Sequence, residues 1–141
     1  MNDKKAKKAD LAEIFSRQDH EAQSAISVNG WRFHHLGIPT QTPRPGERYL
    51  PNLKMYVSGF EDSPYGIQWM RFDADAPHPE IVKTLPHIAF EVDDLATALE
   101  GKEILTPPNN PGEGIMVAMI LDNGAPVELI HFSPELKSST K

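Results

Sequence analysis

Residues 33–38 read FHHLGI, and residues 85–90 read LPHIAF, with a histidine inside an apolar run each time. A second pair of similar stretches follows, GIQWMRF at residues 66–72 and PVELIHF at residues 126–132. The two copies align His35 with His87 and Gln68 with Glu128. Each copy therefore begins with a histidine on one apolar strand and ends with an oxygen-bearing side chain on another. The sequence predicts two similar units that face each other.

Paired copies would bring these four polar side chains together. Alternate residues of a strand share a face, so each of the four lies among apolar neighbours, as in a small-molecule pocket. For any one of them alone, an ordinary hydrogen-bonded side chain is the plainer interpretation. A repeat that places all four in register favours a divalent metal site built from two imidazoles, one amide and one carboxylate.

The remaining strand histidines are assigned no such role. Alternation predicts that His34 and His131 point to the opposite faces of their strands. A slip of one residue in register would exchange His34 with His35, so the first copy is the less firmly assigned of the two.

Composition limits the partners. The chain has 141 residues, enough for one domain, and a formal net charge of −6, which argues against nucleic acid. It has no cysteine, so any metal must bind to nitrogen and oxygen. No stretch is apolar enough to span a membrane, and the lysine-rich start lacks the apolar core of a signal peptide. We expect a cytoplasmic protein that acts on a small molecule.

Residues 1–30 are expected to form an N-terminal helix and a linker outside the repeat. Leu11, Ile14 and Phe15 have helical spacing after Asp10, a good helix cap, and the helix should run to about Gln18. This apolar stripe is expected to pack on its own domain or on a second chain. Residues 135–141 are expected to form a C-terminal tail.

The predicted domain spans residues 31–134 and belongs to the α+β class. In the second copy (85–134), a strand at 87–92 precedes a helix that Asp93 or Asp94 begins and Gly101 ends. Strands at 103–105, 115–121 and 127–132 complete a βαβββ unit. The first copy (31–74) has strands at 31–38, 53–60 and 66–72. Its proline-rich residues 41–51 are expected to form a loop, as are residues 75–86 between the copies.

The first copy is also shorter. His35 and Gln68 lie 33 positions apart (68 − 35), whereas His87 and Glu128 lie 41 positions apart (128 − 87). The first copy is therefore expected to have lost most of its helix.

The region from residue 33 to residue 132 resembles the vicinal oxygen chelate superfamily, which includes glyoxalase I, bleomycin-resistance proteins and extradiol dioxygenases. The best-matching stretches are residues 35–38, 87–95 and 127–130. The resemblance implies paired βαβββ modules in a U-shaped mixed sheet. It also implies a divalent metal (Ni, Zn, Co, Mn or Fe) bound by His35, Gln68, His87 and Glu128, a set similar to those of methylmalonyl-CoA epimerase and glyoxalase I. Members with two modules commonly form homodimers.

The implied function is a metal-dependent lyase or isomerase. It would move a proton beside a carbonyl of a small metabolite, through a metal-bound enediolate, with Glu128 as the base because it is the only carboxylate of the set. One departure is that residues 53–57 lack the carboxylate that a two-base epimerase places there, although Glu47 lies just before them.

Two other functions stay open. His35, His87 and Glu128 alone would form the two-histidine, one-carboxylate triad of an iron(II) ring-cleaving dioxygenase. A non-catalytic protein that binds a drug or metabolite is the third interpretation, for which Phe33, Trp69 and Phe72 would supply an aromatic lining.

Overall fold

The computed structural model describes residues 6–16 and 21–139, in two units. The first comprises residues 1–30 and the second residues 31–141. Each unit is described by itself.

The first unit contains two short helices among its described residues. Helix α1 (Leu11–Phe15) begins after Asp10, whose carboxylate accepts hydrogen bonds from the backbone N–H groups of Ala12 and Glu13. The cap is thus as predicted, but α1 ends earlier, because Ser16 is already extended. The predicted end at Gln18 lies outside the described residues. Helix α2 (Ser24–Ser27) is a single turn in the predicted linker. The side chains of the predicted apolar stripe on α1 are exposed.

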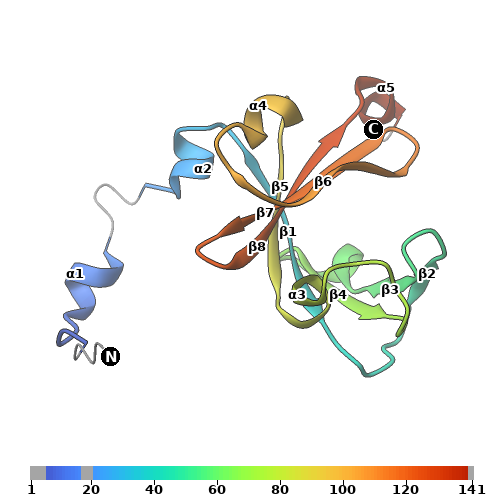
Figure 1. The fold of residues 1–141 in the computed structure, drawn as a ribbon, viewed down its shortest axis with the longest axis horizontal. Coiled ribbons are helices and arrows are strands. Elements are labelled where there is room, and N and C mark those ends of the chain that lie inside the picture. Colours follow the sequence, from blue (N-terminus) through green and yellow to red (C-terminus); the bar gives the residue numbers. More distant parts are fainter. Residues whose placement is uncertain (1–5, 17–20, 140–141) are drawn as a thin grey trace. The chain divides into compact units, whose positions relative to one another are not determined.

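The second unit is built on one curled mixed sheet (Figure 1). Its described strands are β1 (Arg32–Pro39), β2 (Arg48–Leu50), β3 (Met55–Ser58), β4 (Ile67–Phe72), β5 (His87–Glu91), β6 (Glu103–Gly112), β7 (Ile115–Asp122) and β8 (Ala125–Phe132). Their order across the sheet is β2-β3-β4-β1-β5-β8-β7-β6. The last four strands repeat the arrangement of the first four in reverse order, as an approximate twofold rotation about the antiparallel pair β1–β5 would place them. This symmetry confirms the two copies predicted from the sequence.

The helices of the two copies differ. The described helices of this unit are the 3-10 turn η2 (Phe60–Asp62), α3 (Glu80–Thr84), α4 (Leu95–Leu99) and α5 (Pro134–Ser139). Helix α4 begins at Asp94, whose side chain accepts a hydrogen bond from the backbone N–H of Thr97. Gly101 follows it in the left-handed region, with φ +72°. In the first copy the chain runs from β1 to β2 without a helix, as the shorter spacing predicted.

One part of the core of this unit lies between α4 and the second half of the sheet. Helix α4 buries Ala98 and Leu99 and packs against β7 and β8. Leu129 of β8 and Ala118 of β7 are fully buried. Because strand residues alternate between faces, Glu128 lies on the face opposite to Leu129. The helix therefore covers one face of this half-sheet, and the predicted site residues lie on the other.

Several elements differ from the sequence expectations. The strand expected at residues 53–60 ends at Ser58 and is followed by η2, and α5 lies in the segment expected to be a C-terminal tail. Strand β2 lies within the proline-rich segment expected to be a loop, and it pairs with β3. Helix α3 lies in the segment between the copies, directly after Pro79. Strand β6 is ten residues long rather than three, because register shifts let it follow β7 past the two prolines Pro107 and Pro108.

None of the helices in the described residues is long and apolar enough to cross a membrane.

Candidate metal centre

The pairing of β1 with β5 places the two predicted histidine ligands on one face of the sheet. His35 pairs with Ala89, and Gly37 pairs with His87. These two pairs correspond to each other, because the repeat aligns His35 with His87 and Gly37 with Ala89. Directly paired residues of neighbouring strands project to the same face, so both imidazoles lie on the same side. Both histidines are 5% exposed.

The two outer pairings place the oxygen-bearing residues on that same face. Gln68 of β4 is paired with Gly37, and Glu128 of β8 is paired with Ala89. These two pairs are again equivalent between the copies. All four predicted ligands therefore share one face, as the repeat suggested.

Three of the four converge on one point. The Nε2 atoms of His35 and His87 are 3.3 Å apart. The Oε1 atom of Glu128 is 3.1 Å from Nε2 of His87 and 3.4 Å from Nε2 of His35. These three atoms form a nearly equilateral triangle at the β1–β5–β8 junction, and they could hold a metal ion.

The spacing and chemistry of this triangle fit a divalent cation. Zinc lies about 2.0–2.2 Å from imidazole nitrogen and carboxylate oxygen. At angles between octahedral and tetrahedral, two such ligands are about 3.0–3.4 Å apart. The three observed separations fall in this range. Two nitrogens and one oxygen, with no sulfur, suit zinc, nickel, cobalt, manganese and iron.

The carboxylate of the triangle is held in its ionised form. Burial acts to raise the pKa of Glu128, but hydrogen bonds from His35 and His87 outweigh it and lower this pKa to about 2. Glu128 thus supplies a negative charge between two imidazoles at neutral pH. A cation at this point would take the place of the protons that the two rings donate.

Gly37 makes room for this arrangement. A Cβ atom added to Gly37 would lie 2.4 Å from Cε1, 2.8 Å from Nε2 and 2.9 Å from Nδ1 of His87. The imidazole of His87 therefore lies directly over the Cα atom of Gly37. The glycine is needed for space rather than for an unusual backbone conformation. A glycine inside an apolar strand often marks a close approach of another group. This position of Gly37 could therefore have been recognised from the sequence.

His34 does not point away from the site as predicted. Phe33 pairs with Phe90 and His35 pairs with Ala89, which leaves His34 as an extra residue in a β-bulge. A bulge breaks the alternation of faces, and Nδ1 of His34 lies 2.8 Å from Nδ1 of His35. Burial lowers the pKa of His34 below its ordinary value, and the adjacent His35 lowers it further.

His131, by contrast, lies outside the site. Its Nδ1 atom is 3.3 Å from the carbonyl oxygen of Val92. It is a half-buried, hydrogen-bonded histidine of the ordinary kind.

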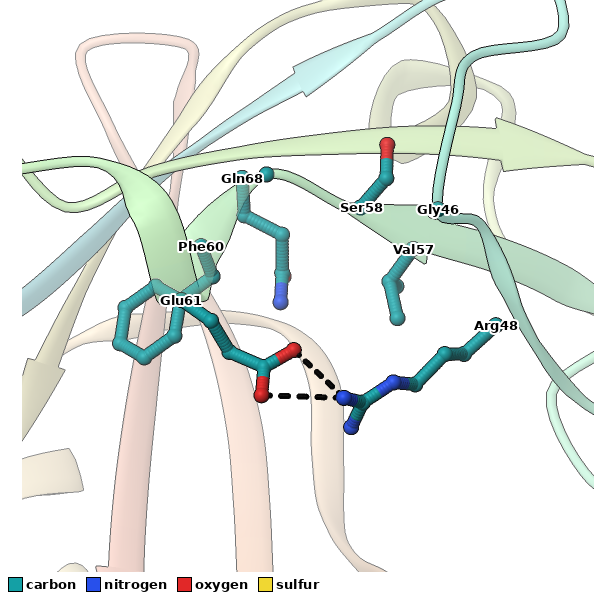
Figure 2. Close-up of a pocket in the computed structure, with 8 residues that line it drawn as sticks. Gly46, Arg48, Val57, Ser58, Phe60, Glu61 and Gln68 are labelled. Atoms are coloured by element: carbon teal, nitrogen blue, oxygen red, sulfur yellow. Dashed lines mark hydrogen bonds and ion pairs between the residues drawn. The ribbon is translucent and has the colours of Figure 1, made fainter.

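Gln68 lines a cavity rather than the triangle. The cavity has a volume of about 260 Å³ and is lined by Gly46, Arg48, Val57, Ser58, Gly59, Phe60, Glu61 and Gln68. Figure 2 shows the amide of Gln68 pointing into this space, opposite the ion pair of Arg48 and Glu61. Within the described residues, no hydrogen bond joins the amide of Gln68 to the three converging atoms.

Phe60 connects the cavity with the histidines. Its ring stacks on His34 at a centroid distance of 5.2 Å and meets His35 edge-on at 6.1 Å. The cavity therefore adjoins the histidine side of the triangle. This contact could not be predicted from the sequence, because residues 53–60 read as a continuous strand and Phe60 belongs instead to η2.

Comparisons with known proteins bear on the fold. No protein-family model and no curated protein matches the sequence. The hypothetical protein BH1468 from Bacillus halodurans C-125 matches with a TM-score of 0.55 and 16% identity, over 72% of this chain and 94% of that chain. Methylmalonyl-CoA epimerase from Mycobacterium tuberculosis matches with a TM-score of 0.52 and 17% identity, over 76% of this chain and 91% of that chain. The chain thus shares its fold with these two proteins, and this is the fold that the resemblance to the vicinal oxygen chelate superfamily implied.

Proposed function

We propose that this protein is a divalent-metal-dependent lyase or isomerase that transfers a proton next to a carbonyl of a small metabolite. The observation that carries the proposal is the convergence of His35, His87 and Glu128 on one point, with separations of 3.1–3.4 Å. The shared fold with methylmalonyl-CoA epimerase, a metabolite isomerase by its name, supports the same reaction class.

We assign metal binding and proton transfer to different residues. His35 and His87 hold the metal through Nε2, and Gln68 is proposed as a further ligand from the cavity side. When bound, the metal supplies a Lewis acid that polarises a carbonyl oxygen. In the described structure both histidines contact Oε1 of Glu128. We therefore assign proton transfer to the other oxygen, Oε2, of this carboxylate.

The cavity beside Gln68 is the proposed substrate site. Its volume of about 260 Å³ suits a small metabolite and lies below the range of about 300–1,000 Å³ found for drug-sized ligands. The exposed ion pair of Arg48 and Glu61, with contacts of 2.8 and 3.0 Å, lies across the cavity from Gln68. A substrate placed here has polar groups on two sides.

A second base from Glu47 does not fit the structure. Both oxygens of Glu47 accept hydrogen bonds from Arg71, at 2.7 and 2.8 Å. This pairing lowers the pKa of Glu47, and Glu47 does not line the cavity. We therefore propose a mechanism in which one carboxylate, Glu128, both accepts and returns the proton.

The direct test is elemental analysis of the purified protein, followed by reconstitution of the metal-free form. We expect one divalent ion per chain, identified as nickel, cobalt, zinc or manganese. A metal-free protein that takes up none of these ions at micromolar concentration would contradict the proposal.

A ring-cleaving dioxygenase is the second candidate, because the three converging donors are two histidines and one carboxylate. This is the donor set of non-haem iron(II) oxygenases. Iron as the bound metal, with oxygen consumption on addition of catechols, would favour it over the lyase or isomerase.

A non-catalytic binding protein is the third candidate, and the aromatic lining expected for it is not found in the cavity. Phe33, Trp69 and Phe72 do not line the cavity described above. Trp69 instead lies under the guanidinium of Arg44, at 4.2 Å. Tight metabolite binding by the metal-free protein, without turnover, would nevertheless support it.

Substitution of Gln68 tests its proposed role as a ligand. Gln68→Glu should retain the metal, because the carboxylate is nearly isosteric and is a stronger oxygen ligand. It should slow turnover, since the charge of the metal with its ligands falls from +1 to zero and stabilises an anionic intermediate less well. Gln68→Ala should weaken metal binding. Unchanged metal affinity in Gln68→Ala, or complete loss in Gln68→Glu, would remove Gln68 from the ligand set.

We also propose a homodimer that involves the N-terminal unit. Leu11 and Phe15 of α1 are 69% and 72% exposed, and an apolar stripe of this kind is usually buried against another surface. Deleting the residues before Val28 should therefore reduce dimerisation or stability. Light scattering at micromolar concentration measures the first and thermal unfolding the second. A monomeric full-length protein would contradict the dimer.

A further inference from the structure

The β-bulge at His34 brings two successive histidine rings together. Residues next to each other on a regular strand point to opposite faces. Here the extra residue turns His34 back towards His35, so that the rings meet edge-to-face with centroids 5.1 Å apart. Their Nδ1 atoms are 2.8 Å apart, which is a hydrogen-bond distance. Bulges are frequent next to active sites, where they re-aim a side chain.

The direction of this hydrogen bond decides whether His35 can bind a cation. A neutral imidazole carries its proton on one nitrogen and a lone pair on the other. If His35 is to offer the lone pair of Nε2 to the triangle, its proton must be on Nδ1. That proton then points at Nδ1 of His34, which must accept it. In the reverse direction His34 donates, the proton of His35 moves to Nε2, and this nitrogen is no longer a ligand.

Aromatic contacts hold the ring of His34 in the position where its Nδ1 can accept the hydrogen bond from His35. Its ring stacks on Phe60 with an interplanar angle of 10°, and it contacts Phe132 at 5.6 Å. The other histidine of the triangle lacks comparable support. Nδ1 of His87 is buried and has no hydrogen-bond partner among the described residues. Of the two proposed ligand histidines, His35 is therefore the one whose second ring nitrogen has a hydrogen-bond partner, and that partner is His34.

We propose that His34 is a positioning residue. In the metal-bound protein it accepts a hydrogen bond from Nδ1–H of His35 and thereby fixes the tautomer in which the lone pair of Nε2 of His35 faces the metal, whereas without metal this nitrogen donates to Glu128. This inference rests on the proposed metal site. Groups that support a ligand histidine in this way typically contribute 10–100-fold to metal affinity.

Two substitutions separate this role from simple packing. In His34→Asn, the side-chain oxygen occupies nearly the position of Nδ1 and can still accept the hydrogen bond, but the aromatic ring is lost. In His34→Phe, the ring that stacks on Phe60 is kept and the acceptor is lost. We expect zinc affinity, measured by competition with a chromophoric chelator, to fall about 10–100-fold in His34→Phe. His34→Asn should stay within about threefold of the wild type, since it retains the acceptor.

A packing role predicts the opposite order, with His34→Asn the weaker binder. His131→Phe is the matched control, because His131 is a half-buried strand histidine whose hydrogen bond among the described residues is to a backbone carbonyl. It should leave zinc affinity unchanged.

Nuclear magnetic resonance gives a second readout that does not depend on activity. Long-range proton–nitrogen spectra of the zinc-loaded protein should show His35 protonated at Nδ1 and His34 protonated at Nε2. A proton on Nδ1 of His34 in the zinc-loaded wild type would overturn the inference, as would wild-type affinity in His34→Phe. A wild-type protein that binds no metal would instead overturn the proposed function on which it rests.

Discussion

Gly37→Ala is expected to abolish metal binding while the fold is retained. The added Cβ atom would lie 2.4 Å from Cε1 of His87, whereas ordinary Cβ contacts are at least 3.4 Å. The imidazole of His87 must therefore retreat by about 1 Å, and metal–ligand distances tolerate only about ±0.2 Å. We expect affinity to fall by more than about 100-fold, beyond the loss typical of a residue that merely supports a ligand.

The backbone itself should accept the alanine. The equivalent residue of the second copy is Ala89, which lies in the same sheet and pairs with His35. Gly37 also has no left-handed backbone angle that an alanine would strain. The cost in stability should be that of overpacking, about 1–3 kcal/mol, measurable as a lower Tm with an unchanged circular dichroism spectrum.

The control for this substitution is Gly112→Ala. Gly112 is also a strand glycine without a left-handed angle, and an added Cβ atom would meet nothing within 4 Å. It should bind metal as the wild type does. Because Gly37→Ala acts through His87, the double variant with His87→Ala should lose no more affinity than His87→Ala alone. Full metal content in Gly37→Ala would mean that His87 is not a ligand in the proposed position.

The repeat in the sequence was sufficient to predict the pairing of the copies. It aligned His35 with His87 and Gln68 with Glu128, and the strand registers relate these residues in the same way. The reason is physical, since two modules with the same apolar pattern bury the same faces when they pair. The loss of the first helix followed equally from the shorter spacing between His35 and Gln68.

What the sequence could not supply are features created by pairing between distant segments. The bulge at His34 exists only because Phe33 and His35 pair with consecutive residues of β5. Strand β2 is three residues long and exposed, so no local alternation marks it, and its pairing with β3 defines it. The cavity likewise depends on η2, which places Phe60 and Glu61 opposite Gln68.

The acid sensitivity of the metal-free protein should depend on Glu128. The pKa of this carboxylate is lowered to about 2 in the folded protein, from an ordinary value of 4.5. A carboxyl group with a lowered pKa stabilises the fold above its unfolded pKa, and this stabilisation is lost as the pH falls through the folded pKa. Between about pH 5 and pH 2, the metal-free wild type should therefore lose more stability than metal-free Glu128→Gln. Parallel urea unfolding curves across this range in both proteins would contradict the assigned pKa.

Glu128→Ala is expected to remove the metal and its stabilising effect together. The substitution deletes the only negative charge of the triangle, so that a cation would meet two buried imidazoles, with their Nε2 atoms 3.3 Å apart, and no carboxylate. The metal-free variant should stay folded, because the backbone pairing of β8 with β5 and β7 does not depend on this side chain.

Thermal unfolding of Glu128→Ala with and without zinc provides the measurement. A ligand that binds only the folded state at about 100 times its Kd stabilises that state by about 2.7 kcal/mol. For a domain of this size such a gain raises Tm by on the order of 10 °C. The wild type should show this rise, and Glu128→Ala should show none. His87→Ala should behave in the same way, because each variant removes one corner of the same triangle. If both variants kept one metal per chain and the wild-type rise in Tm, the metal would have to bind elsewhere, and Glu128 would lose its proposed role in proton transfer as well.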